Sequence, residues 1–498
     1  VGYWNFEEGS GTTAYDQTPN GNNGTINGAA YSTNVPSQSC GLINANGCDS
    51  TAVLNLTINY ADTSYTNITA CDSVVWNGVT YDSSGQYTYM PEFMQIGQDI
   101  DGNNGDGKGF SVSLSSDGNI MAIGAPFGEG GGGVLFGNVG IFENIGGSWS
   151  QIGQDIDAEA SGDVFGSSVS LSSDGNTVAI GAPYSNSILN PGGWAYAVGH
   201  VSIYKNIGGS WSQIGNDIEG DAAEDLFGES VSLSSDGNTV AIGATGYGNT
   251  NFGQVRIYEN TGGSWSQIGQ GIDGEAYGDR SGNSVSISSD GNTVAIGAQS
   301  NDGNGNSSGH VRIYENIASI WSQIGNDIDG EAAGDQSGWS VSLSSDGQTV
   351  AIGAVSNVGA AGNFGGHVRI YENIGGSWSQ IGDDIDGGAN WDQFGASVSL
   401  NTDGNTVAIG APSNVASGGN GCYVHIYKNI GGSWSQIGGD IEGEAAGDNS
   451  GQSVSLSSDG NTVAIGAPFN ITAAGNNGGH VRVYNLPTLT NAGGCDST

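Results

Sequence analysis

The feature that most constrains this chain is a long internal repeat. Residues 321–373 read WSQIGNDIDGEAAGDQSGWSVSLSSDGQTVAIGAVSNVGAAGNFGGHVRIYEN, and this text recurs with small changes from about residue 92 to residue 485. The aspartate of its SSDG-type turn marks seven copies, 54 to 62 residues apart: Asp117, Asp174, Asp236, Asp290, Asp346, Asp403 and Asp459. A period of this length indicates an array of supersecondary units, because one copy cannot bury its own apolar surface.

The hydrophobic pattern inside one copy has a period of two. Residues 340–344 alternate strictly, and residues 349–354 place Val350 and Ile352 on one face with small residues on the other. Residues 367–371 and 378–385 continue this pattern, so each copy predicts four strands. The Ser-Asp-Gly link between the first two strands is too short for anything but a tight hairpin, whose positive φ angles Asp-Gly supplies.

Seven four-stranded antiparallel sheets predict an all-β fold, a seven-bladed β-propeller. Residues 93–97 match the fourth strand of a copy, whereas the last copy stops after its third strand at residues 481–484. We therefore expect blade seven to combine three C-terminal strands with one N-terminal strand. Such closure removes open sheet edges and brings the two ends of the propeller together.

Charge and composition exclude several classes of partner. The chain carries 50 acidic and 8 basic side chains among 498 residues, a formal charge of -42. This charge argues against nucleic acid and anionic membranes, and it favours cations or basic surfaces. No apolar run is long enough for a membrane helix, and no signal peptide opens the sequence. Because residue 1 falls inside a module that has already begun, we expect a processed or partial chain.

The repeat resembles the FG-GAP repeat of integrin α-subunit propellers and of many bacterial extracellular proteins. Its FG pairs are Phe165-Gly166, Phe227-Gly228 and Phe394-Gly395, and its GAP triplets begin at Gly124, Gly181, Gly410 and Gly466. The resemblance covers all seven copies, although the fourth and fifth lack both the Phe and the Pro. It implies a propeller with an adhesive or ligand-binding role outside the cell. It does not carry over the calcium-binding hairpin, because the SSDG turn offers a single carboxylate where calcium takes six to eight oxygens.

Two further resemblances divide the rest of the chain. Residues 1–35 resemble the start of a laminin-G or jelly-roll domain, and residues 36–91 resemble Cys-containing β modules of Bacteroidota surface proteins. The final residues GCDST repeat residues 47–51, so we expect residues 486–498 to complete this module and residues 92–485, the propeller, to be inserted in it. That resemblance favours a disulfide between Cys71 and Cys495, with Cys40 and Cys48 as a weaker pair. Cys422 then has no partner cysteine, and we expect it to be a free thiol buried in a blade.

Acidic residues recur in the connection between the fourth strand of one copy and the first strand of the next. Their spacing of 1, 3, 5 and 9 is partly that of a calcium loop, but position 12 is not a bidentate Glu. Divalent-cation binding, with Ca²⁺ as the candidate cofactor, and a solvated acidic rim both remain open. The candidate ligands are Asp99, Asp101, Asp106, Asp155, Asp157, Glu159, Asp163, Asp327, Asp329, Glu331, Asp335, Asp440, Glu442, Glu444 and Asp448, with Asn103 in the first copy.

The connections between the second and third strands vary most in length and text, which is where binding specificity usually resides. Aromatic residues stand here, or in the acidic connections, where other copies have small or polar ones: Trp194, Tyr196, Tyr247, Trp339 and Trp391. They are candidates for stacking on sugar rings, or alternatively for covering the central channel.

No arrangement of residues predicts catalysis. The tryptophans at the start of each fourth strand and the histidines at the start of the third strands recur from copy to copy, and we interpret both as structural. No nucleophile triad, phosphate-binding loop or CxxC pair is present. We expect a secreted or cell-surface, non-enzymatic binding module of adhesion type that recognises an extracellular protein or glycan. A lectin-like propeller is the alternative, and a polysaccharide-degrading enzyme a more distant one.

Overall fold

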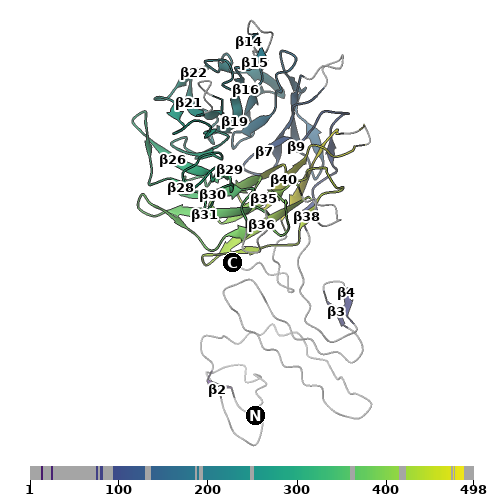
Figure 1. Cartoon of the computed structure of the whole chain (residues 1–498). Coiled ribbons are helices and arrows are strands. Elements are labelled where there is room, and N and C mark those ends of the chain that lie inside the picture. Colours follow the sequence, from purple (N-terminus) through teal and green to yellow (C-terminus); the bar gives the residue numbers. More distant parts are fainter. Residues whose placement is uncertain are drawn as a thin grey trace, which may run out of the picture. The chain divides into compact units, whose positions relative to one another are not determined.

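The structure is a computed structural model of the chain (Figure 1). It describes residues 93–128, 136–185, 197–246, 252–358, 365–413, 422–472, 475 and 477–486, together with the backbone of a few short strands elsewhere. The chain divides into two units, Val1–Gln86 and Tyr87–Thr498. In the first unit, β1 (Thr13–Ala14) pairs with β2 (Gly24–Thr25), and β3 (Val74–Trp76) pairs with β4 (Val79–Tyr81). The predictions for the jelly-roll remnant, the Cys module and Cys40, Cys48, Cys71 and Cys495 otherwise lie outside the described residues.

The second unit confirms the all-β, seven-bladed β-propeller, and every blade is an antiparallel sheet. Within the described residues, no helix has the length and apolar character needed to span a membrane. The first strands are β7 (Ser111–Leu114), β12 (Ser168–Leu171), β19 (Phe227–Leu233), β24 (Ser284–Ile287), β29 (Ser337–Leu343), β34 (Ser397–Leu400) and β39 (Ser453–Leu456). The second strands are β8 (Ile120–Ala125), β13 (Thr177–Ala182), β20 (Thr239–Ala244), β25 (Thr293–Ala298), β30 (Thr349–Ala354), β35 (Thr406–Ala411) and β40 (Thr462–Ala467).

No strand of a blade is longer than its third strand. These strands are β9 (Asn138–Asn144), β16 (His200–Ile207), β21 (Gln254–Thr261), β26 (His310–Ile317), β31 (His367–Asn373), β36 (Tyr423–Ile430) and β41 (His480–Asn485). In blade two, the short hairpin of β14 (Ile188–Leu189) and β15 (Ala195–Tyr196) extends the connection before β16.

The predicted fourth strand is in fact two short strands, both paired with the third. The first pieces are β5 (Met94–Gln95), β10 (Trp149–Gln151), β17 (Ser210–Gln213), β22 (Ser264–Gln267), β27 (Ile320–Gln323), β32 (Trp378–Gln380) and β37 (Ser433–Gln436). The second pieces are β6 (Ile100–Asp101), β11 (Ile156–Asp157), β18 (Ile218–Glu219), β23 (Ile272–Asp273), β28 (Ile328–Asp329), β33 (Ile385–Asp386) and β38 (Ile441–Glu442). The break falls at a glycine such as Gly325, whose φ of 72° lies outside the β region.

The ring closes as the repeat boundaries predict. β41 of the last copy pairs with β5 and β6 from the start of the propeller, with Tyr484 opposite Gln95 and His480 opposite Asp101. The first and last parts of the propeller sequence, purple and yellow in Figure 1, therefore share one sheet.

The two alternating serines of each first strand connect neighbouring blades. In blade five, Ser340 Oγ donates to the Gly395 carbonyl at 2.7 Å, and Ser342 Oγ accepts the Leu400 amide at 2.9 Å. The same two bonds recur at all seven blade junctions, including that between blades seven and one through Ser453 and Ser455. These bonds satisfy backbone groups that the stacked sheets would otherwise bury unpaired.

A tryptophan belt forms the outer contact between blades. In six blades the indole Nε1 donates to an isoleucine carbonyl of the preceding blade, as Trp321 does to Ile268 at 3.1 Å. The donors are Trp149, Trp211, Trp265, Trp321, Trp378 and Trp434. In blade seven the equivalent residue is Phe93, which packs with the core between blades six and seven but has no such donor. The interpretation of these tryptophans as blade-packing residues is confirmed.

Candidate functional site

The propeller has one uniform face and one variable face. On the uniform face, the first strand ends six positions before the second begins in every blade, as between Leu343 and Thr349. The backbone amide of one hairpin donates to the carbonyl of the next, as from Ser116 to Ser173 at 2.9 Å, and seven such bonds form a closed ring. The connections from second to third strands and from one blade to the next lie on the opposite, variable face.

On the variable face, histidine and carboxylate side chains from two adjacent blades meet at three blade junctions. In cluster B, His367 Nδ1 lies 4.0 Å from Glu331 Oε2 and 3.9 Å from Asp384 Oδ2. His367 begins β31, Asp384 directly precedes β33 of the same blade, and Glu331 follows β28 of the preceding blade. The histidine ring is buried, whereas the carboxylates are partly exposed.

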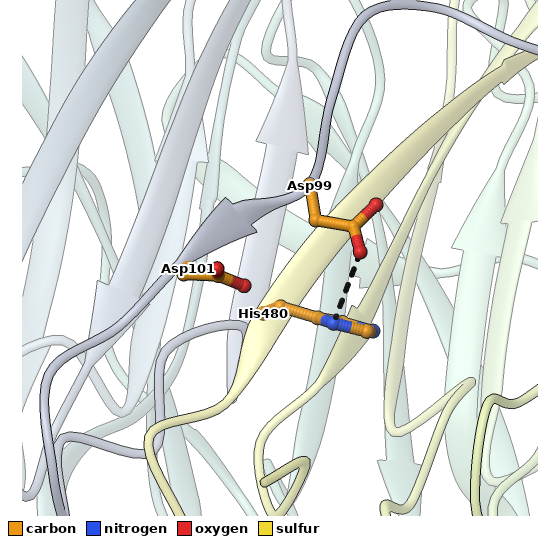
Figure 2. Close-up of side chains that lie close together, drawn as sticks. All are labelled: Asp99, Asp101 and His480. Atoms are coloured by element: carbon orange, nitrogen blue, oxygen red, sulfur yellow. Dashed lines mark ion pairs between the residues drawn. The ribbon is translucent and has the colours of Figure 1, made fainter. Parts of the chain in front are cut away.

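Clusters A and C have the same geometry. In cluster A, His310 Nδ1 lies 4.0 Å from Glu275 Oε2 and 3.8 Å from Asp327 Oδ2. In cluster C, His480 Nδ1 lies 3.8 Å from both Asp99 Oδ2 and Glu444 Oε2. Asp101, on β6 opposite His480, is a further carboxylate of cluster C. Figure 2 shows Asp99 beside the imidazole and Asp101 on the neighbouring strand.

An arginine two residues after each histidine completes the arrangement. Arg369 Nη2 donates to the Asp329 carbonyl of the preceding blade at 2.7 Å, and Nη1 lies 3.9 Å from Glu331 Oε1. Its guanidinium lies over the Tyr371 ring, 5.6 Å from the centroid. Arg312 and Arg482 make the equivalent backbone bonds. Each arginine therefore binds adjacent blades together, and in clusters A and B it also holds one oxygen of the glutamate beside the histidine.

Burial governs the charge state of these groups. Burial and, after it, the nearby Arg369 lower the pKa of His367 to about 4, although Asp384 and Asp335 oppose the change. The pKa values of His310 and His480 are also lowered, first by burial. Partial burial raises the pKa of Glu331, and Asp384 adds to this effect. At neutral pH the imidazole of each cluster is therefore uncharged.

The four acidic positions of one connection do not face a common point. In blade four, Asp327 faces His310 of its own blade, whereas Glu331 faces His367 of the next. Asp335 is buried, and its Oδ2 accepts the Ala332 amide at 2.8 Å. The equivalent Asp106, Asp163 and Asp448 are likewise buried acceptors for amides of their own loops.

The remaining predicted ligands are placed as follows. Asp155 and Asp440, like Asp99 and Asp327, accept a hydrogen bond from the glutamine four residues earlier. Asp157, Asp329 and Glu442 end the second outer pieces β11, β28 and β38 and are exposed. Glu159 lies in the exposed connection after β11.

Only some of the predicted aromatic residues can be placed. Trp194 and Tyr247 lie outside the described residues, and for Tyr196 only the backbone of β15 is described. Trp339 is half-buried near the start of β29. Trp391 is 56 % exposed in the connection between β33 and β34. Tyr277 and Tyr184, which the sequence analysis did not select, are also exposed on this face.

Trp391 has an unusual backbone conformation, with φ at +67°. The equivalent residue is a glycine in five of the six other connections, for example Gly334 with φ +91° and Gly278 with φ +90°, and it is Glu224 with φ +69° in the sixth. A bulky residue in the left-handed region is disfavoured by roughly 1–2 kcal/mol. This backbone therefore suits glycine better than tryptophan.

The clusters were missed because their ligands come from consecutive copies of the repeat. The amino-acid sequence nevertheless contains a signal that pairs these positions. Where a copy has Gly388 in place of the glutamate, the next copy has Tyr423 and His425 in place of the histidine and arginine. There, Tyr423 donates its hydroxyl to Asp392 at 2.7 Å instead. In blade two Ser202 replaces the arginine, and His200 Nδ1 lies 2.6 Å from Ser185 Oγ. Comparing each copy with the next would have revealed that the glutamate and the histidine are lost together at Gly388 and Tyr423.

The chain was compared with known proteins at the level of sequence. No protein-family model and no curated protein matches it. The propeller architecture therefore stands on the repeat and on the structure.

Proposed function

We propose that the propeller is an extracellular, non-enzymatic binding module of adhesion type whose variable face binds the ligand. The single observation that carries this proposal is Trp391, a large exposed aromatic side chain held at a positive φ where five of the six equivalent positions have glycine. A residue kept in an unfavourable conformation on a surface loop indicates a use for its side chain.

Several features support the choice of this face. The uniform face is built from near-identical hairpins bonded into a ring, whereas the variable face differs from blade to blade. The likeness to FG-GAP repeats adds the expectation of an adhesive role outside the cell. The high negative charge favours a basic or cation-bridged partner.

A carbohydrate ligand is the second candidate. Trp391, Tyr277 and Tyr184 provide exposed aromatic rings on three blades, and aromatic faces are suited to stacking against the apolar face of a sugar ring. In this case the module would be a lectin-like propeller, with separate small sites instead of one extended surface.

The test is a binding screen of the full chain against a glycan array and a panel of immobilised extracellular matrix proteins. Trp391→Gly should abolish binding to the ligand found while leaving stability unchanged or higher, because glycine suits the positive φ. The control is Ile374→Ala, an exposed residue of the uniform face in the same blade, which should bind as the unmodified protein does.

Either of two results would reject the proposal. Binding that Trp391→Gly leaves intact would remove Trp391 from the ligand site. Turnover of a polysaccharide in the same screen would show an enzyme.

A further inference from the structure

We propose that clusters A, B and C are three equivalent binding sites for a divalent transition-metal ion such as Zn²⁺ or Mn²⁺, each ligated by a histidine Nδ1 and carboxylates of two adjacent blades. This inference concerns the blade junctions and does not depend on the ligand proposed for the variable face.

The first argument is that the potential ligand atoms of each cluster lie close together and are of a suitable kind. In clusters A and B, the histidine, glutamate and aspartate each offer one ligand atom, and these atoms lie within 4.8 Å of one another. In cluster C, Asp99, Asp101 and His480 meet the same condition, with Glu444 close by. One imidazole nitrogen with two or three carboxylate oxygens suits Zn²⁺ or Mn²⁺, whereas Ca²⁺ takes oxygen ligands only.

The second argument is an unpartnered buried nitrogen, which is Nδ1 of the histidine in cluster B and Nε2 of His310 and His480 in clusters A and C. The side chain of His367 is 2 % exposed, and its buried Nδ1 has no hydrogen-bond partner in the described part of the chain. This nitrogen faces both Glu331 and Asp384 at distances too long for a hydrogen bond. A buried nitrogen without a partner costs about 1–3 kcal/mol, and a cation between the three groups would satisfy it.

The third argument is that the ligand atoms can move close enough together to coordinate one ion. Ligand atoms about 2.0–2.2 Å from a tetrahedral ion are roughly 3.4 Å apart, so the observed 3.9–4.0 Å separations in cluster B must shorten by about half an ångström. The glutamate and aspartate are partly exposed and can rotate to do so, whereas the histidine is fixed by burial. Arg369 anchors the other oxygen of Glu331, which is the outer-shell support that metal-binding side chains commonly have.

The experiment uses the full chain, freed of metal with a chelator and dialysed against Zn²⁺, with bound metal measured by mass spectrometry. We expect three ions per chain and ligand-field absorption bands on substitution with Co²⁺. Glu331→Gln should lower the count from three to two. Because Glu331 is partly exposed, this variant is expected to fold. His367→Gln should do the same.

Two matched controls keep the test specific. Glu372→Gln removes an exposed carboxylate of β31 that belongs to no cluster. His200→Gln removes the equivalent histidine of blade two, whose Nδ1 already contacts Ser185 Oγ and whose blade has Ser202 in place of the arginine. Both should retain three ions. The proposal is overturned if Zn²⁺ does not bind, if Glu331→Gln retains three ions, or if Ca²⁺ displaces Zn²⁺ at equal concentration.

Discussion

Replacing Gly353 by alanine should destabilise the propeller, because two blades approach each other closely at this glycine. A Cβ atom at Gly353 would lie 2.1 Å from the Gly395 carbonyl oxygen of the next blade and 2.5 Å from Ser340 Oγ. Real Cβ atoms essentially never come within 3.0 Å of another heavy atom. In a closed ring, neither blade can retreat without disturbing its other neighbour.

The size of the effect follows from three contributions. Overpacking costs about 1–3 kcal/mol, and displacing the Gly395 carbonyl weakens its hydrogen bond from Ser340, worth about 1 kcal/mol. Alanine also lowers the conformational entropy of the unfolded chain, which raises the free energy of unfolding by roughly 0.4–1 kcal/mol. We expect the free energy of unfolding to fall by about 2 kcal/mol, seen as a lower denaturant midpoint.

Gly439→Ala is the matched control. A Cβ atom there meets nothing within 4 Å, and the backbone lies outside the left-handed region. The same substitution should therefore leave the free energy of unfolding unchanged or raise it by up to about 1 kcal/mol. A loss at Gly353 below about 0.5 kcal/mol, or an equal loss at both sites, would refute the close-packing argument.

Two further predictions concern the blade junctions. Phe93→Trp should supply the missing donor of the tryptophan belt to the Ile437 carbonyl and raise the free energy of unfolding by about 1 kcal/mol in denaturant titrations; an unchanged midpoint would contradict it. The pKa of His367 is lowered from 6.5 to about 4 in the folded protein. The neutral imidazole therefore contributes to the free energy of unfolding in full above pH 6.5, and this contribution of about 3 kcal/mol is lost as the pH falls towards 4. In the presence of a chelator, His367→Gln should flatten the fall in stability between pH 6.5 and 5, and a slope equal to that of the unmodified protein would argue against this.

The architecture was predictable because each level of the repeat agrees with the others. Alternation in Ser-Val-Ser-Leu, the Asp-Gly turn and the partial first and last copies together predict the blades and their closure. The sheet topology confirms the blades, and the pairing of β41 with β5 confirms the closure. The split of the fourth strand was not predicted, because its cause is the positive φ of a glycine such as Gly325. A glycine in a strand pattern does not reveal its φ.

The clusters were harder to predict for a different physical reason. Asp327 and Glu331 are four residues apart in one acidic stretch, yet they contact histidines of different blades. The spacing of acidic residues along one loop suggested a single site, but the fold assigns these residues to different sites. The relevant distances run across the junction between blades, and they depend on how the sheets stack.

The closure of blade seven also determines how the propeller responds to mechanical tension. Met94 at the start of β5 is paired with Asn485 at the end of β41, so the chain enters and leaves the sheet at the same point. A pulling force on both ends loads the hydrogen bonds between these strands one after another, as in unzipping, instead of sharing the load among them. Because β5 is only two residues long, this contact yields first. A propeller attached at both ends would lengthen by opening blade seven while the other six blades stay folded.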